Sequence, residues 1–261
     1  GLLDLLFHTC VSSFSAARSA LYRNNGDRTF TLMTQAEVGP IVTFTTHGAA
    51  TWADYDDDGW LDLYCPNWRG RDRLFRNDAT GGFVSVTNTV TASTQQATTL
   101  AAAWGDYDND GRIDLCAITW GGPAIVYRNQ GLGHFEPADI GQTISTTGDS
   151  ASWADYDNDG FLDLLLGGVG NLFYRNSGDG TLAKITSGSI LSDGAGAPWY
   201  SYSALWFDYD NDGFLDLYVS NGDDSTWETL TNGLYRNNGN ANAWLKIKPV
   251  GTASNRDGVG A

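Results

Sequence analysis

The sequence has few cysteines, few basic residues and no long apolar run. Its three cysteines among 261 residues, Cys10, Cys65 and Cys116, include no CxxC pair, so neither a zinc site nor a complete disulfide framework is indicated. We expect small buried thiols instead. No stretch of 18 apolar residues occurs, and the short apolar start from Gly1 to Phe7 carries Asp4. The sequence therefore predicts neither a membrane-inserted helix nor a signal peptide.

Basic residues are outnumbered two to one by acidic residues. Fifteen Lys and Arg stand against 31 Asp and Glu, and the formal net charge is -16. A charge of this sign argues against nucleic acid or an anionic membrane as partner. Only three of the acids are Glu, whereas Asp and 32 Gly are abundant. Asp and Gly are typical of turns between strands, so we expect little helix.

One nine-residue phrase, DYDxDGxxD, occurs four times. The copies begin at Asp54, Asp106, Asp155 and Asp208, and a partial fifth copy, Gly1 to Leu5, lacks the first three carboxylates. The motif glycines are 58, 52, 49 and 53 residues apart. This period suits one four-stranded antiparallel blade per repeat, so the sequence predicts an all-β fold, a β-propeller of four complete units and one partial unit.

A second phrase, an apolar pair followed by Arg and Asn, comes after each acidic loop. Its arginines are Arg23, Arg76, Arg128, Arg175 and Arg236. In four copies an apolar residue follows seven positions later, and in the fifth copy Trp244 follows at eight, a pattern typical of a hairpin between the last two strands. We expect these arginines to pair with loop carboxylates.

A tryptophan precedes each complete acidic loop by two residues. These tryptophans are Trp52, Trp104, Trp153 and Trp206. Because they recur at the repeat spacing, we interpret them as packing between blades rather than as a binding site.

Four carboxylates within nine residues repel one another unless a hard cation lies among them. Positions 1, 3, 5 and 9 can supply carboxylates, position 7 a carbonyl, and the glycine at position 6 allows a sharp turn. All-oxygen ligands favour Ca²⁺ over Mg²⁺ or Zn²⁺, so we expect about four Ca²⁺. The predicted metal ligands are Asp54, Asp56, Asp58, Trp60, Asp62, Asp106, Asp108, Asp110, Arg112, Asp114, Asp155, Asp157, Asp159, Phe161, Asp163, Asp208, Asp210, Asp212, Phe214 and Asp216. The loops lack the Glu at position 12 that an EF-hand requires.

These two phrases resemble the FG-GAP or VCBS repeats of integrin-α-like propellers. The tail from Trp244 to Ala261 resembles the start of an ASPIC/UnbV segment, so the chain is similar to the cartilage acidic protein family. We divide it into repeats over 1–240 and an ASPIC/UnbV-like segment over 241–261. The resemblance implies a propeller usually of seven blades, calcium in the hairpin loops, an extracellular location (secreted or cell surface), and adhesion or binding rather than catalysis.

Partner binding is expected opposite the calcium loops, where the connections vary between repeats. Four aromatic residues outside the repeat pattern lie there and form a tentative ligand face for an extracellular protein or glycan: Trp68, Trp120, Trp199 and Trp227. The alternative is that they fold onto the rim of the propeller. No common catalytic motif occurs. Outside the repeats, only Asp223, Asp224 and Glu228 offer paired carboxylates for a carbohydrate-active enzyme, so we predict no enzyme.

The partial first copy leaves one blade without its first strand. Residues upstream of Gly1, the stretch from Trp244 to Ala261, or a strand from a neighbouring subunit could complete it. Of these we favour upstream residues, because the sequence begins inside a motif whose remaining half is intact. Completion by a neighbour would make a homo-oligomer, a ring or a filament.

Overall fold

A computed structural model describes residues 4–8, 19–44, 48–67, 70–87, 99–145, 148, 150–168, 170–192, 199–223 and 231–242. The helices in this part are α1 (Gln35–Val38), the 3₁₀ helix η1 (Gly39–Val42) and α2 (Ser189–Ser192), and the other regular elements are strands. The expected all-β fold is confirmed. No helix among the described residues is long and apolar enough to cross a membrane.

Two of the five sheets lie in a first unit, residues 1–98, 132–134 and 247–261. Each is antiparallel and connects its strands in sequence order. The strands of the first sheet are β1 (Leu5–His8), β2 (Ser19–Asn24) and β3 (Phe30–Leu32). The strands of the second sheet are β4 (Thr51–Ala53), β5 (Asp62–Cys65), β6 (Arg73–Asn77) and β7 (Phe83–Val86).

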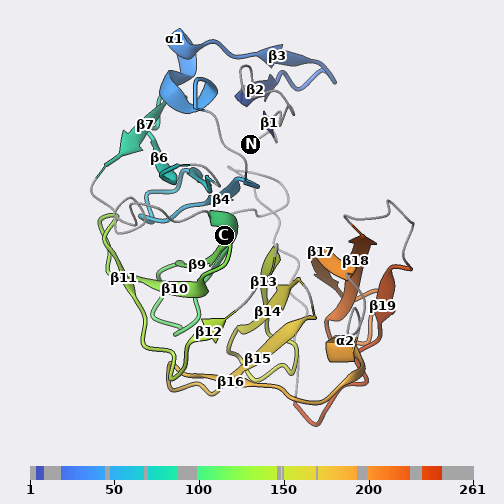
Figure 1. The fold of residues 1–261 in the computed structure, drawn as a ribbon. Coiled ribbons are helices and arrows are strands. Elements are labelled where there is room, and N and C mark those ends of the chain that lie inside the picture. Colours follow the sequence, from blue (N-terminus) through green and yellow to red (C-terminus); the bar gives the residue numbers. More distant parts are fainter. Residues whose placement is uncertain are drawn as a thin grey trace. The chain divides into compact units, whose positions relative to one another are not determined.

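Three sheets lie in the second unit, residues 99–131 and 135–246 (Figure 1). The third sheet contains β8 (Thr99–Gly105), β9 (Asp114–Thr119), β10 (Pro123–Asn129), β11 (Phe135–Pro137) and β12 (Ile144–Ser145). The fourth contains β13 (Ser150–Ala154), β14 (Asp163–Gly167), β15 (Leu172–Asn176) and β16 (Leu182–Lys184). The fifth contains β17 (Trp199–Phe207), β18 (Asp216–Asp223) and β19 (Gly233–Tyr235). These sheets are propeller blades, as predicted.

Two blades differ from the expected four strands. The third sheet has an additional strand, β12. It follows β11 in the chain and pairs with β10, where Ala124 lies opposite Ile144. The fifth sheet has three strands in the described part of the chain. Its expected fourth strand begins near Trp244, outside the described residues.

The partial copy at the start of the chain has the predicted register. Leu5 of β1 pairs with Tyr22, just as Leu63 of β5 pairs with Phe75. The backbone N–H of Asn24 donates to Asp4 Oδ1 at 2.8 Å. In the same way, the N–H of the matching Asn77 in a complete copy donates to Asp62 Oδ1. Along the residues that the structure covers, no strand pairs with the other edge of β1. The identity of a completing strand stays a prediction.

Neighbouring sheets within the second unit pack through their first strands. Trp153 Nε1 donates to Ala103 O at 3.3 Å, and Trp206 Nε1 donates to Ser152 Oγ at 3.1 Å, so each indole reaches the preceding blade. Gly105 lies against Trp153, where a Cβ atom would come within 2.8 Å of the ring. Inter-blade packing is therefore confirmed for these two tryptophans.

The first unit has its own core, in which Val38 and Ile41 of the α1–η1 connection are 1% exposed. The other residues of α1, Gln35, Ala36 and Glu37, are exposed. Cys65 and Cys116 are buried and unbridged, as expected, and burial raises the pKa of the Cys116 thiol to about 12. Cys10 lies outside the described residues.

Candidate metal sites in the acidic loops

Each acidic loop connects the first two strands of a complete blade and turns through two left-handed residues. Position 4 has a φ of 54° to 59° and is occupied by Asp57, Asn109, Asn158 and Asn211. The glycine at position 6 has a φ of 85° to 92°. Asn, Asp and Gly tolerate this conformation best, so the sequence of the loop sets its shape.

The loop backbone wraps around the carboxylate at position 1. In the second loop Asp106 Oδ1 accepts from the N–H of Asp110 at 3.1 Å, and Oδ2 accepts from Gly111 at 3.0 Å. Asp110 Oδ1 in turn accepts from the N–H of Arg112 at 2.9 Å. The other three loops repeat these bonds. The carboxylates are thus held in place by the chain itself.

The carboxylate at position 9 joins the loop to the third strand of its blade. Asp114 is fully buried, its Oδ2 accepts from the N–H of Tyr107 at 3.1 Å, and its Oδ1 accepts from the N–H of Asn129 at 2.8 Å. Burial is the main cause that raises its pKa to about 7. The equivalent residues Asp62 and Asp163 have pKa values raised to about 7 for the same reason.

The asparagine after each recurring arginine fixes this arrangement, a role that we do not predict for it from the sequence. Asn129 Nδ2 donates to Ile113 O at 3.0 Å, and its Oδ1 accepts from the N–H of Gly131 at 2.8 Å. Asn77, Asn176 and Asn237 make the same two kinds of bond. Recurrence of Asn at this position in all five copies was the available signal.

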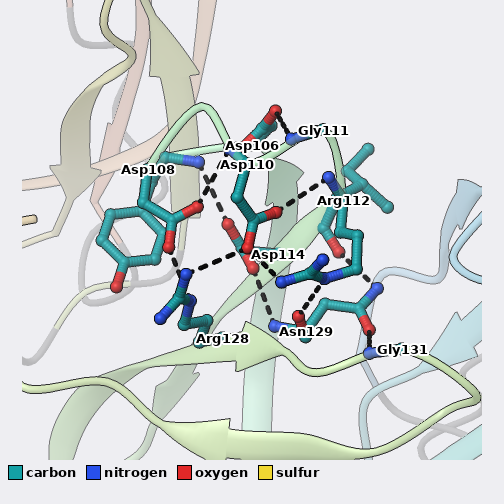
Figure 2. Close-up of polar contacts among 11 residues, drawn as sticks. Asp106, Asp108, Asp110, Gly111, Arg112, Asp114, Arg128, Asn129 and Gly131 are labelled. Carbon is teal, nitrogen blue, oxygen red and sulfur yellow. Dashed lines mark hydrogen bonds and ion pairs between the residues drawn. The ribbon is translucent and has the colours of Figure 1, made fainter.

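Three of the five recurring arginines pair with the carboxylates at positions 3 and 5, as predicted, and the partial first copy lacks these carboxylates for Arg23. Arg128 lies 2.6 Å from Asp108 and 3.1 Å from Asp110, and Figure 2 shows its guanidinium between them. Arg175 and Arg236 make the equivalent pairs, whereas Arg76 lies 3.8 Å from Asp56. In the second loop Arg112 also contacts Asp110.

The structure brings three of the four predicted carboxylates together in each loop, with one oxygen from each within 4.8 Å of the others. The groups are Asp54, Asp56 and Asp58; Asp106, Asp108 and Asp114; Asp155, Asp157 and Asp163; and Asp208, Asp210 and Asp216. Position 9 is left out of the first group and position 5 out of the others. The position 7 residues hydrogen-bond through their N–H groups, and their carbonyl ligation stays a prediction.

Two oxygens in these groups indicate that a cation fits. Oδ1 of Asp56 and Oδ1 of Asp157 are buried without a hydrogen-bond partner. An unpaired buried carboxylate oxygen is costly, and a hard cation among the carboxylates satisfies it. Desolvation and the neighbouring Asp58 raise the pKa of Asp56 although Arg76 lies 3.8 Å away, so Arg76 only partly compensates the charge of this carboxylate.

The predicted ligand face is only partly within the described residues. Trp120 lies in the turn between β9 and β10, at the opposite end of β9 from the acidic loop, and is 53% exposed. Trp199 begins β17, and its side chain is not described. Trp68 and Trp227 lie outside the described residues. The ligand face therefore stays a prediction.

The FG-GAP-like repeat matches residues 1–65, 54–117, 106–166 and 167–219, which includes every acidic loop. The chain belongs to the FG-GAP-like repeat family. Each match ends just after an acidic loop, so the ends of successive matches follow the spacing of the acidic phrase. The predicted family is thereby confirmed.

Relatives of this FG-GAP-like chain include cartilage acidic protein 1 of Mus musculus, 28% identical over 204 residues, and of Homo sapiens, 27% identical. Each alignment covers 72% of the chain, which spans only 30% of the length of either relative. A solved Agrocybe aegerita lectin that recognises non-reducing terminal N-acetylglucosamine is similar in fold. Its TM-score is 0.52 at 17% identity, over 90% of this chain and 66% of the lectin.

Proposed function

We propose that the chain is an extracellular module that binds about four Ca²⁺ for stability and engages a glycan or a protein, without catalysis. The observation that carries the calcium part is the convergence of three carboxylates in each of four loops, with partnerless buried oxygens at Asp56 and Asp157. When bound, Ca²⁺ would supply the positive charge that these carboxylates lack.

Calcium is preferred because every donor in the loops is an oxygen. Ca²⁺ accepts six to eight such ligands in flexible geometry, whereas Mg²⁺ demands a near-ideal octahedron and keeps several waters. Four Ca²⁺ would add +8 to the formal charge of -16 and leave -8. Surface loops of this kind suit the higher calcium concentrations outside cells, where weaker sites are filled.

We prefer binding to catalysis because backbone N–H groups hold the recurring carboxylates of the loops in place, which is a structural role. The lectin of similar fold, which recognises a sugar, supports a binding role. Trp120 offers an exposed aromatic surface at the end of the blade remote from the acidic loops. Exposed aromatic side chains are enriched where proteins bind glycans or other proteins.

We expect the Trp to Ala variant at all four positions of the ligand face, Trp68, Trp120, Trp199 and Trp227, to bind an identified partner at least about 10-fold more weakly. Calcium uptake should be unchanged. Phe30→Ala is the matched control, because Phe30 is 44% exposed and belongs neither to the ligand face nor to an acidic loop. Titration of each variant with the partner measures the effect. Full affinity in the fourfold variant would reject the ligand face.

A self-assembling structural subunit is the second candidate, favoured by one observation. The last blade exposes Leu205 by 59%, Tyr209 by 45% and Leu234 by 55%. The residues equivalent to Tyr209 in two other blades, Tyr55 and Tyr107, are only 4% exposed. A second copy could cover this face.

If it does, the molecular mass in solution should rise with concentration, and Leu205→Asp with Leu234→Asp should give monomers. Light scattering after size exclusion decides the matter. A wild-type chain that stays monomeric at all concentrations excludes this alternative.

A further inference from the structure

In the second unit, equivalent hydrogen bonds cross the first gap, between the third and fourth sheets, and the second gap, between the fourth and fifth sheets. At the acidic-loop end, Asn109 Nδ2 donates to Gly160 O at 2.7 Å across the first gap, and Asn158 Nδ2 donates to Gly213 O at 3.0 Å across the second. Asn176 Nδ2 reaches Tyr107 O, and Asn237 Nδ2 reaches Tyr156 O, each at 2.7 Å. The two gaps therefore share two bridges.

A third bridge is present in the second gap alone. Asn240 Nδ2 and Asn242 Nδ2 both donate to the backbone oxygen of Asp157, at 2.6 Å and 2.7 Å. In the first gap the equivalent positions are Asp179 and Thr181. A carboxylate cannot donate a hydrogen bond to a carbonyl oxygen, so Asp179 cannot close this gap onto Asp108.

The first gap remains open as a cleft of about 570 Å³, within the usual range for small-molecule sites. Side chains from two blades meet in it: Asp108, Arg128, Gln130, Glu136, Asp139 and Asp179. The turn residues Gly178 and Gly180 also line it, and at Gly180 an added Cβ atom would meet nothing within 4 Å. A ligand can therefore approach the backbone closely there.

Asp179, Asp139 and Arg128 are held in place before any ligand binds. Asp179 Oδ1 accepts from the N–H of Thr181 at 3.0 Å, and Asp139 Oδ1 accepts from the N–H of Gly141 at 3.1 Å. These bonds fix both carboxylates and leave Oδ2 of each for a ligand. Arg128 is held by its pairs with Asp108 and Asp110. Because these groups are already oriented, little ordering is needed on binding.

We propose that this cleft binds a neutral sugar residue, which rests on the proposed binding function and names its ligand and place. Sugar hydroxyls both donate and accept, so they can pair with the carboxylates and with the Gln130 amide together. Four carboxylates against the single guanidinium of Arg128 disfavour sialylated or sulfated sugars. Pro137 and Ala138 add a small apolar edge.

The chain itself suggests the decisive variant, Asp179→Asn. Asn240 shows that asparagine fits this turn, since its Oδ1 accepts from the N–H of Asn242 at 2.7 Å while its Nδ2 makes the bridge. Asp179→Asn should therefore fold normally, bridge to Asp108 O and close the cleft. Asp139→Asn keeps the acceptor for Gly141 and removes one charge without a bridge.

The test is an array of neutral hexose-terminated and N-acetylhexosamine-terminated glycans, their sialylated counterparts and a lysine-rich peptide, probed in calcium. Wild type should bind neutral glycans, and Asp179→Asn should lose at least about 10-fold in affinity, with a smaller loss for Asp139→Asn. Asp27→Asn is the matched control, because Asp27 makes the same contacts with Thr29 in the first blade and does not line the cleft.

Four results would overturn the proposal. They are equal neutral-glycan binding by wild type and Asp179→Asn, preference for sialylated glycans, binding to the lysine-rich peptide alone, and no binding of any glycan. In the first case, loss of binding in the fourfold Trp variant would place the glycan on the ligand face and leave the proposed function standing. If wild type binds no glycan, the cleft proposal is wrong, and the proposed function then depends on a protein partner.

Discussion

Removal of calcium should lower the melting temperature of the protein by at least about 20 °C. At 100 times the dissociation constant, each bound ion stabilises the fold by about 2.7 kcal/mol, and four independent sites by roughly 11 kcal/mol. That sum is comparable to the whole stability of an ordinary domain. For a chain of this size each kcal/mol corresponds to about 2–4 °C. Differential scanning calorimetry in EDTA and in excess Ca²⁺ measures the shift.

The control for this experiment is the choice of ion added back. Ca²⁺ should restore the melting temperature, whereas the same concentration of Mg²⁺ should restore much less of it, because the loops are flexible cages of protein oxygens. Equal melting temperatures in EDTA and in calcium would mean that the four acidic loops are stable hairpin tips without any ion.

Asp163→Ala should destabilise the protein by roughly 2–6 kcal/mol even in EDTA. Asp163 is 1% exposed, and its oxygens accept from the N–H groups of Tyr156 and Asn176 at 3.2 Å and 2.8 Å. Removal of the carboxylate leaves two donors without acceptors, at about 1–3 kcal/mol each. Measurement in EDTA separates this loss from the loss of a metal ligand. Urea unfolding followed by tryptophan fluorescence gives the free energy of unfolding.

Two further variants define the origin of that loss. Asp163→Asn keeps one acceptor oxygen and should lose less stability than Asp163→Ala. Asp27→Ala removes an exposed carboxylate and should change the free energy of unfolding by less than about 1 kcal/mol. If Asp163→Ala unfolds at the same urea concentration as wild type, position 9 is not the structural link between loop and third strand.

The acidic loops could be predicted from the sequence because their chemistry is local. Nine residues fix the carboxylate spacing and the glycine at position 6, so the spacing predicts that Asp106, Asp108, Asp110 and Asp114 lie together. In the structure three of these four, all but Asp110, converge. The pairing of Arg128 with this loop follows from its constant place in the repeat. Such a long-range pairing can be predicted because the arginine recurs at the same place in every copy, which a single copy would not show.

Long-range features could not be predicted in the same way. The strand β12 forms because Ile144 returns to β10, and nothing in its two residues identifies a strand. The difference between Asp179 and Asn240 is visible in the sequence. Its consequence depends on the backbone oxygen of Asp157, which lies 83 residues before Asn240 in the chain and meets it only in the folded blades.

We propose that the four acidic loops are calcium sites. Isothermal titration of Ca²⁺ into protein stripped of metal by a chelator tests this most directly, because it counts the ions. Uptake of about four Ca²⁺ per chain is the predicted result, falling to about three when Asp155 and Asp157 are both changed to Asn. A titration with no calcium uptake would contradict the claim.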